Sequence, residues 1–89
     1  MKIKLELYGA SRDFSNKNYL DFDIKEKIKI KDFKIKIIDY LDKKFNRNKN
    51  FKIIVETSAF CSEDNNIIND SYKISKDQKI GIIPPIGGG

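Results

Sequence analysis

The chain has 89 residues, of which 39% are hydrophobic and 35% charged, and a formal net charge of +5. This size and apolar content predict one compact domain and exclude a disordered chain, and no apolar stretch has the length of a membrane span or a secretion signal, so we expect a cytoplasmic protein. With no histidine and a single cysteine, Cys61, the sequence excludes a histidine-based catalytic relay, an internal disulfide and a thiolate zinc site, and we expect no bound metal.

The first part of the chain predicts a β-hairpin. Polar and apolar residues alternate over residues 2–8 (KIKLELY) and again over residues 19–24 (YLDFDI), as in strands with one buried face. The segment between them, GASRDFSNKN, is rich in glycine, serine, aspartate and asparagine. These residues favour turns because their side chains bond to nearby backbone or tolerate unusual φ.

A change of period at Ile30 predicts an amphipathic helix. Apolar residues then recur at spacings of three and four and form one stripe: Ile30, Phe33, Ile37, Leu41 and Phe45. Asp32 in the first turn and Lys43 near the last suit the helix dipole. The polar segment NRNKN then ends the helix.

The rest of the chain predicts further strands. The β-branched run FKIIVET (residues 51–57) is typical of a central strand, and SAFCSEDNN after it is polar enough for a loop. We expect an irregular excursion over residues 58–69, a short strand in IINDSYKI, and a last strand in KIGIIP. Pro84 must end this strand because proline has no amide hydrogen for the ladder.

The order of elements, β, β, α, β, short β and β, predicts an α+β fold. A mixed sheet of about four to five strands would be covered on one face by one main helix, which is the β-grasp or ubiquitin-like architecture. We expect residues 1–83 to form this domain and residues 84–89 to form a flexible C-terminal tail.

The ending IIPPIGGG resembles the PPxxGG ending of the MoaD-like small sulfur-carrier subunits of molybdopterin synthase, which belong to the ubiquitin-like β-grasp carriers. Pro84 and Pro85 match the proline pair, and Gly88 and Gly89 match the terminal glycines. The segment LYGASRDF also resembles the family's first strand and the residues after it. Two departures are the turn SKDQK, where the family has an acidic Gly-Asp turn, and Gly87, where serine, threonine or alanine is commoner.

The resemblance implies a non-catalytic sulfur carrier in molybdenum cofactor biosynthesis. In such carriers an E1-like, MoeB-like adenylyltransferase uses ATP to activate the C-terminal carboxylate, here that of Gly89, which becomes a thiocarboxylate. Sulfur then passes to a pterin precursor in the large, MoaE-like catalytic subunit. This chain would bind no cofactor itself. Gly88 and Gly89 would form a thread narrow enough for a buried active site, Gly87 would help to present it, and Pro84 and Pro85 would be its stiff base.

The same resemblance implies a partner surface. Tyr8 and Ile83 match positions of a hydrophobic contact face, Ile86 continues it into the tail, and Arg12 matches an arginine that could pair with a partner carboxylate. The alternative for Tyr8 and Ile83 is that they are ordinary core or rim residues. Cys61 is interpreted as incidental, because a lone loop cysteine needs a special environment to be reactive.

Two other functions remain open from the sequence. The Gly-Gly terminus would also serve a ubiquitin-like protein modifier, or a carrier for tRNA thiolation or of the thiamine type. The segment 25–52 has eleven basic against four acidic residues, which favours a basic nucleic-acid or protein interaction domain. Its aromatic residues lie on the apolar helix stripe, however, and this placement argues against nucleic-acid binding.

Overall fold

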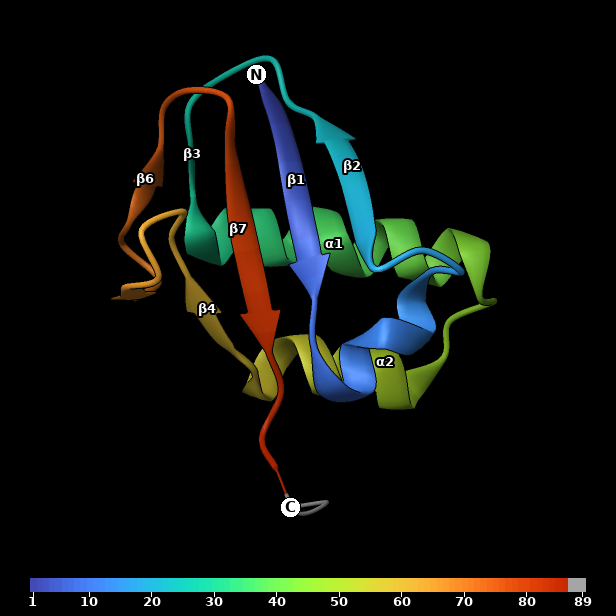
Figure 1. Ribbon diagram of the computed structural model, residues 1–89. Helices are drawn as coiled ribbons and strands as arrows, with labels where there is room; N and C mark the ends of the chain where they lie inside the picture. Colours follow the sequence, from blue (N-terminus) through green and yellow to red (C-terminus); the bar gives the residue numbers. More distant parts are fainter. Residues whose placement is uncertain (87–89) are drawn as a thin grey trace.

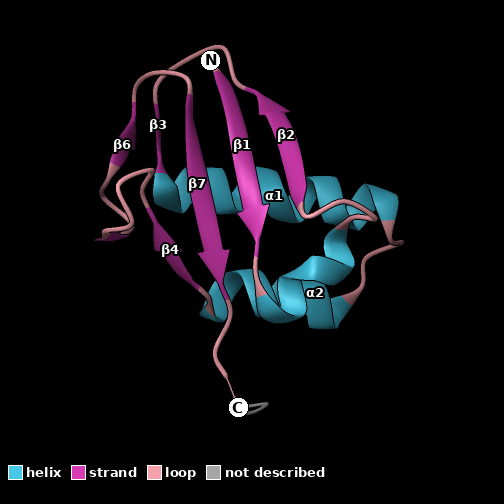
Figure 2. Cartoon of the chain, in the orientation of Figure 1, coloured by secondary structure: helices cyan, strands magenta, loops and turns pink. Residues whose placement is uncertain are grey.

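The computed structural model describes residues 1–86. Its elements in chain order (Figures 1 and 2) are β1 (Lys2–Leu7), the 3-10 helix η1 (Gly9–Phe14), β2 (Tyr19–Asp23), β3 (Ile28–Lys29), α1 (Ile30–Lys44), α2 (Lys49–Thr57), β4 (Ala59–Cys61), β5 (Ile67–Ile68), β6 (Lys73–Ile74) and β7 (Gln78–Ile83). Over these described residues, no helix has both the length and the apolar character needed to cross a membrane.

The main sheet has five strands in the order β2-β1-β7-β4-β5. β1 and β7 pair in parallel at its centre, whereas β1 with β2 and β7 with β4 pair antiparallel, so the sheet is mixed. α1 crosses behind the strands, and β3 and β6 form a small separate ladder at one side (Figure 1). The predicted α+β, β-grasp architecture is confirmed.

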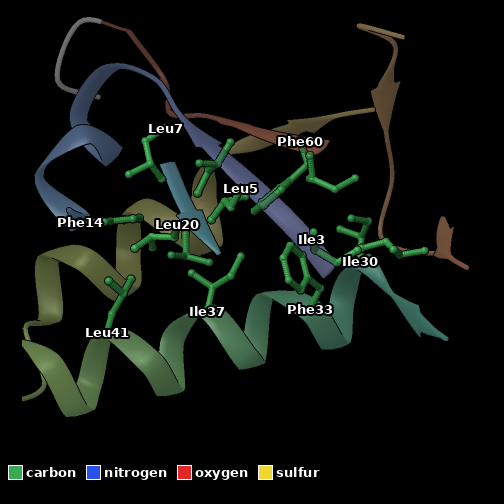
Figure 3. Packing of buried hydrophobic residues seen from close by; sticks show 14 of the residues in the cluster. Ile3, Leu5, Leu7, Phe14, Leu20, Ile30, Phe33, Ile37, Leu41 and Phe60 are labelled. Carbon is green, nitrogen blue, oxygen red and sulfur yellow. The ribbon is translucent and has the colours of Figure 1, made fainter. Parts of the chain in front are cut away.

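The core lies between the sheet and α1. Alternation along β1 turns Ile3, Leu5 and Leu7 toward the helix, and each is at most 2% exposed. On α1 the predicted stripe does the same, with Phe33 and Ile37 fully buried against the sheet (Figure 3). Burial of each such side chain stabilises the fold by about 1.5–3 kcal/mol, which is what fixes the helix on this face.

The prediction of a central strand over residues 51–57 is wrong, because this segment is the helix α2. The side-chain oxygen of Asn48 accepts a hydrogen bond from the backbone N–H of Phe51 and caps the helix. Phe51, Ile54 and Val55 then fall at helical spacing, with Val55 fully buried and Phe51 packed edge-on against Phe45 at 4.9 Å. Tertiary packing of this face outweighs the β-propensity of the run.

The predicted excursion over residues 58–69 is partly strand. Phe60 in β4 is 1% exposed and lies opposite Ile82 of β7, while β5 pairs with β4 at the sheet edge. β4 therefore lies inside the sheet beside β7, whereas residues 51–57, predicted as a central strand, lie outside the sheet in α2. Between β4 and β5 the chain turns through Asn65, whose φ is 63°.

Candidate functional site: the tail base and the outer sheet face

The tail leaves the middle of the sheet, since β7 is flanked by β1 and β4 (Figure 1). Pro84 directly after β7 is buried, whereas Pro85 and Ile86 are exposed, Ile86 by 97%. A Cβ placed on Gly9 would lie 3.8 Å from Cδ of Pro84, so this proline packs beside the turn after β1. Of the two prolines predicted as the stiff base, Pro84 is thus packed against the domain, and the exposed part of the tail begins at Pro85.

The predicted tail residues Gly87, Gly88 and Gly89 lie outside the described residues. The structure therefore places the point from which they continue, and their expected roles stay predictions.

The buried hydroxyl of Ser11, which was not among the predicted site residues, fixes the turn after β1 by two hydrogen bonds. Ser11 is 0% exposed, and its Oγ donates to the carbonyl of Tyr8 at 2.6 Å and accepts from the N–H of Tyr8 at 2.9 Å. Gly9 between them has φ +55°, a conformation that favours glycine. The spacing of glycine and serine in YGAS was the available signal. This turn holds Tyr8 at the end of β1 and Gly9 beside Pro84.

The sheet face turned away from α1 carries an apolar patch at the same end. Tyr8 and Ile83 are 42% and 37% exposed, which places them on the outer surface rather than in the core. Their neighbours follow from the register: Ala59 lies opposite Ile83, Cys61 opposite Gly81, and Ile67 opposite Cys61. We call this set the outer patch: Tyr8, Ala59, Cys61, Ile67, Gly81 and Ile83.

The missing side chain of Gly81 leaves room for the side chains of Tyr8 and Cys61 to pack over its backbone. A Cβ built there would lie 2.6 Å from Sγ of Cys61 and 3.3 Å from Cε2 of Tyr8. The tyrosine ring and the thiol therefore occupy the space above this glycine. Cys61 lies in β4 and not in the predicted loop, and it is only 8% exposed and packs as a small apolar group.

The other predicted contact residues lie around this region. Arg12 is exposed on η1, two residues before Phe14, which packs against Phe51 of α2 at 5.0 Å and fixes that short helix. Ile86 continues the exposed surface beyond the tail base. Among residues 1–86, no cluster of three or more histidine, cysteine, aspartate or glutamate side chains could hold a metal ion.

Substituting Gly81→Ala is expected to destabilise the fold by about 1–3 kcal/mol, because the added methyl overlaps Sγ of Cys61. Urea unfolding of both proteins measures this difference. The double variant Gly81→Ala with Cys61→Ala should recover part of the loss, since the sulfur is then gone. Equal stability of the wild type and the single variant would contradict this packing.

Comparisons with known proteins identify the fold. No family model and no curated protein matches the sequence. Among solved structures, a putative molybdopterin converting factor, subunit 1, from Pyrococcus furiosus is similar, with a TM-score of 0.69, 12% identity, and 96% of this chain and 98% of that chain covered. SAMP1 from Haloferax volcanii is similar with a TM-score of 0.70, 8% identity and full coverage of both chains.

Proposed function

We propose that this protein is a ubiquitin-like sulfur carrier that acts as the small subunit of a molybdopterin synthase. It is not an enzyme on its own and supplies sulfur from the C-terminal carboxyl of Gly89. The observation on which the proposal chiefly rests is the Pro-Pro-x-Gly-Gly-Gly ending, placed directly after the central strand of a β-grasp fold. The fold likeness to the putative converting factor subunit supports the same assignment.

The proposed chemistry has three steps. A carboxylate oxygen of Gly89 attacks the α-phosphorus of ATP on an E1-like, MoeB-like enzyme, and pyrophosphate leaves. Hydrosulfide, or an equivalent sulfur nucleophile, then attacks the acyl carbon and displaces AMP, which leaves a thiocarboxylate. The thiocarboxylated tail next enters the large, MoaE-like subunit, where its sulfur attacks a carbon of a pterin precursor; water then attacks the acyl carbon, the bond between that carbon and sulfur breaks, and the carboxylate of Gly89 is regenerated. ATP is bound by the activating partner, and this chain needs no cofactor.

The geometry of the tail base supports this role. A tail that must enter two different buried sites needs a fixed origin and a slim end. Pro84 is buried beside Gly9 and fixes the origin, while Pro85 and Ile86 are exposed. The outer patch begins at this origin with Tyr8 and Ile83, so a partner that takes the tail can dock on apolar surface beside it. Arg12 on η1 is a candidate for pairing with a partner carboxylate.

The intact mass of the untagged protein tests the proposal. Incubation with an E1-like adenylyltransferase from the same organism, ATP and sodium sulfide is expected to raise the mass by about 16 Da, because one oxygen is replaced by sulfur. A parallel incubation without ATP should leave the mass unchanged. No mass increase with an enzyme that loads another carrier would overturn the proposal.

The products of the same reaction distinguish the sulfur carrier from the related alternative, a ubiquitin-like protein modifier. A ubiquitin-like modifier uses the activated Gly89 carboxyl to acylate a lysine amine, so it yields conjugates heavier by one whole chain minus water. If such conjugates form in extract and no sulfur reaches a pterin precursor, modification or another sulfur pathway is the function. The fold is shared by both classes and does not choose between them.

A further inference from the structure

A second recognition surface lies on the small ladder of β3 and β6. In this ladder Lys29 lies directly opposite Lys73, and Ile28 lies opposite Ile74. Ile74 is fully buried and Ile28 is half-buried, so the alternation of side chains turns the two lysines to the exposed face. Figure 1 shows the ladder at the upper left, with the tail leaving at the bottom. Nothing in the proposed sulfur chemistry uses this surface.

The two opposed lysines are close neighbours. Ile30 donates its backbone N–H to the carbonyl of Tyr72 at 2.9 Å, directly beside the opposed pair. In an antiparallel ladder this bond places Lys29 and Lys73 at a non-hydrogen-bonded position, where the two Cα atoms are about 4.5 Å apart. Like charges directly opposite each other destabilise a ladder. An anion bound over both lysines would remove this repulsion.

No carboxylate of the described residues neutralises the pair. The ion pair formed over residues 1–86 joins Lys34 to Asp70 at 2.6 Å, and neither Lys29 nor Lys73 takes part in one. Lys34 shows that a lysine of this region does pair where a carboxylate is within reach. The two opposed lysines are therefore free for a negative group from outside the chain.

Three more lysines extend the surface. Because β3 and β6 are antiparallel, the residues before β3 lie beside those after β6, which brings Lys27 and Lys76 to one end of the ladder. At the other end Lys31 follows, and its backbone N–H bonds the carbonyl of Asp70. All five side chains are exposed. We call this set the ladder lysines: Lys27, Lys29, Lys31, Lys73 and Lys76.

Acidic residues in the same segments do not cancel this charge. Asp70 is paired with Lys34, and the carboxylate of Asp77 accepts the backbone N–H of Lys2. Glu26 and Asp32 remain beside the five lysines, so the surface keeps a net positive charge. A surface of this kind attracts polyanions.

The composition of the surface favours phosphates over a protein partner. The exposed large apolar side chains of the described residues all lie outside it: Tyr8, Ile35, Ile53, Ile67, Ile83 and Ile86. Protein interfaces are depleted in lysine and need apolar or arginine anchors, and both arginines of the chain also lie elsewhere. Lysine binds phosphate as a point charge. The regular row of charges on a nucleic-acid backbone is the partner that such a surface fits.

The surface offers no ring on which unpaired bases could stack. Tyr72 beside the ladder is half-buried, and its hydroxyl donates to Oε1 of Gln78 at 3.3 Å. The aromatic side chains of α1 lie on its apolar stripe, as expected from the sequence, and that placement argues against single-stranded ligands. Binding of the phosphates of a double helix needs no ring.

We infer that the ladder lysines bind the backbone of double-stranded RNA. RNA duplexes are recognised mainly through phosphates and 2′-hydroxyls across a wide, shallow minor groove, which a flat surface can meet. Readers of duplex DNA place a helix or a ribbon in the major groove, and a ladder with two residues in each strand is too short to do so. Ser75, exposed between Lys73 and Lys76, adds a hydroxyl that can bond a 2′-hydroxyl.

The salt dependence of binding tests the inference on the full-length protein. The probe is a labelled RNA duplex of mixed sequence and about 20 base pairs, and fluorescence anisotropy follows its binding between about 50 and 200 mM salt. The logarithm of the association constant should fall against the logarithm of salt concentration with a slope of about −4, because each neutralised phosphate contributes about −0.9. No binding, or a slope near zero, would overturn the inference.

Two double variants locate the RNA. Lys29→Ala with Lys73→Ala should reduce the slope to about −2, since two phosphate contacts are lost. Lys49→Ala with Lys52→Ala removes the same charge from α2, away from the ladder, and should leave the slope at about −4. Equal changes in both variants would place the RNA elsewhere and overturn the inference.

A single charge reversal separates binding from folding. Lys73→Glu places a carboxylate opposite Lys29, so without RNA the melting temperature should rise by about 2–4 °C. The same variant should bind the RNA duplex about tenfold more weakly in about 100 mM salt. Unchanged RNA binding by this variant would contradict the inference, and a lower melting temperature would contradict the opposed lysine pair on which it rests.

Other ligands have distinct outcomes in the same assay. A DNA duplex of the same sequence should bind about fivefold more weakly, because it has no 2′-hydroxyls and a narrower minor groove. Equal binding of the DNA duplex, of a polyglutamate peptide or of phosphatidylserine vesicles would show that the surface accepts any polyanion and would overturn the assignment to RNA. A variant lacking residues 87–89 should bind RNA as the full chain does, so this test is independent of sulfur loading.

Discussion

Removal of Gly88 and Gly89 is expected to abolish sulfur loading while the fold stays intact. The shortened chain ends in a carboxylate that falls short by two residues, about 7 Å in an extended tail. Adenylation requires the attacking oxygen to lie about 3–3.5 Å from the α-phosphorus, so such a displacement removes the reaction. The mass increase of about 16 Da should be absent. The melting temperature should stay within about 2 °C, because β7 ends at Ile83.

Gly87→Ala is the matched control for this deletion, because it changes the tail but keeps its length. It should still load, since a small side chain stands at the matching position in the resembled family. Loading of the shortened chain at the normal rate would contradict the role of Gly89. Loss of loading in both variants would indicate that the enzyme rejects any altered tail. The shorter reach of the carboxylate toward the α-phosphorus would then not explain the loss.

Ile83→Asp is expected to raise the KM of the activating enzyme for this protein about thirtyfold. Ile83 lies on the outer patch next to the tail base and is 37% exposed, so the change puts a charge into the proposed contact rather than into the core. Residues at the centre of a contact commonly contribute about 2 kcal/mol or more, which corresponds to this factor. Steady-state loading rates at varied protein concentration measure the KM.

Ile53→Asp provides the comparison for Ile83→Asp. Ile53 lies on α2, is 54% exposed and is not part of the outer patch. The same substitution there should change the KM less than about threefold. If the two variants behave alike, the outer patch is not the docking surface, and the effect is one of charge or solubility.

The α+β fold was predictable because its main signals are local periods. β1 alternates without a break, and the stripe of α1 from Ile30 to Leu41 is buried as its spacing indicated. Residues 51–57 gave the wrong prediction because Ile53, Ile54 and Val55 favour a strand locally. Their helical state depends on the cap at Asn48 and on the packing of Phe51 against Phe14 and Phe45, contacts that a sequence pattern does not contain.

The candidate site was predictable in its residue types but not in its arrangement. The sequence left open whether Tyr8 and Ile83 are core or surface, and their exposure places them on the outer face. The sequence predicts the same role for both prolines, whereas in the structure Pro84 is buried and Pro85 is exposed. Ser11 bonds to Tyr8 three residues earlier, so the local pattern YGAS carried a signal for its role. The role of Gly81 depends on Cys61 and Tyr8 on the neighbouring strands, so no local pattern could have identified it.

The parallel pairing of β1 with β7 links the maturation of the fold to that of the tail. These strands join residues far apart in sequence, with Ile3 opposite Gln78. Beside them, the backbone N–H of Lys2 donates to the side-chain carboxylate of Asp77, just before β7, across 75 positions. Such distant pairing forms slowly and only after the later strand has left the ribosome. A nascent or cleaved chain without β7 lacks both the centre of its sheet and the anchor at Pro84. An activating enzyme that docks on the outer patch would therefore engage only chains whose folding is complete.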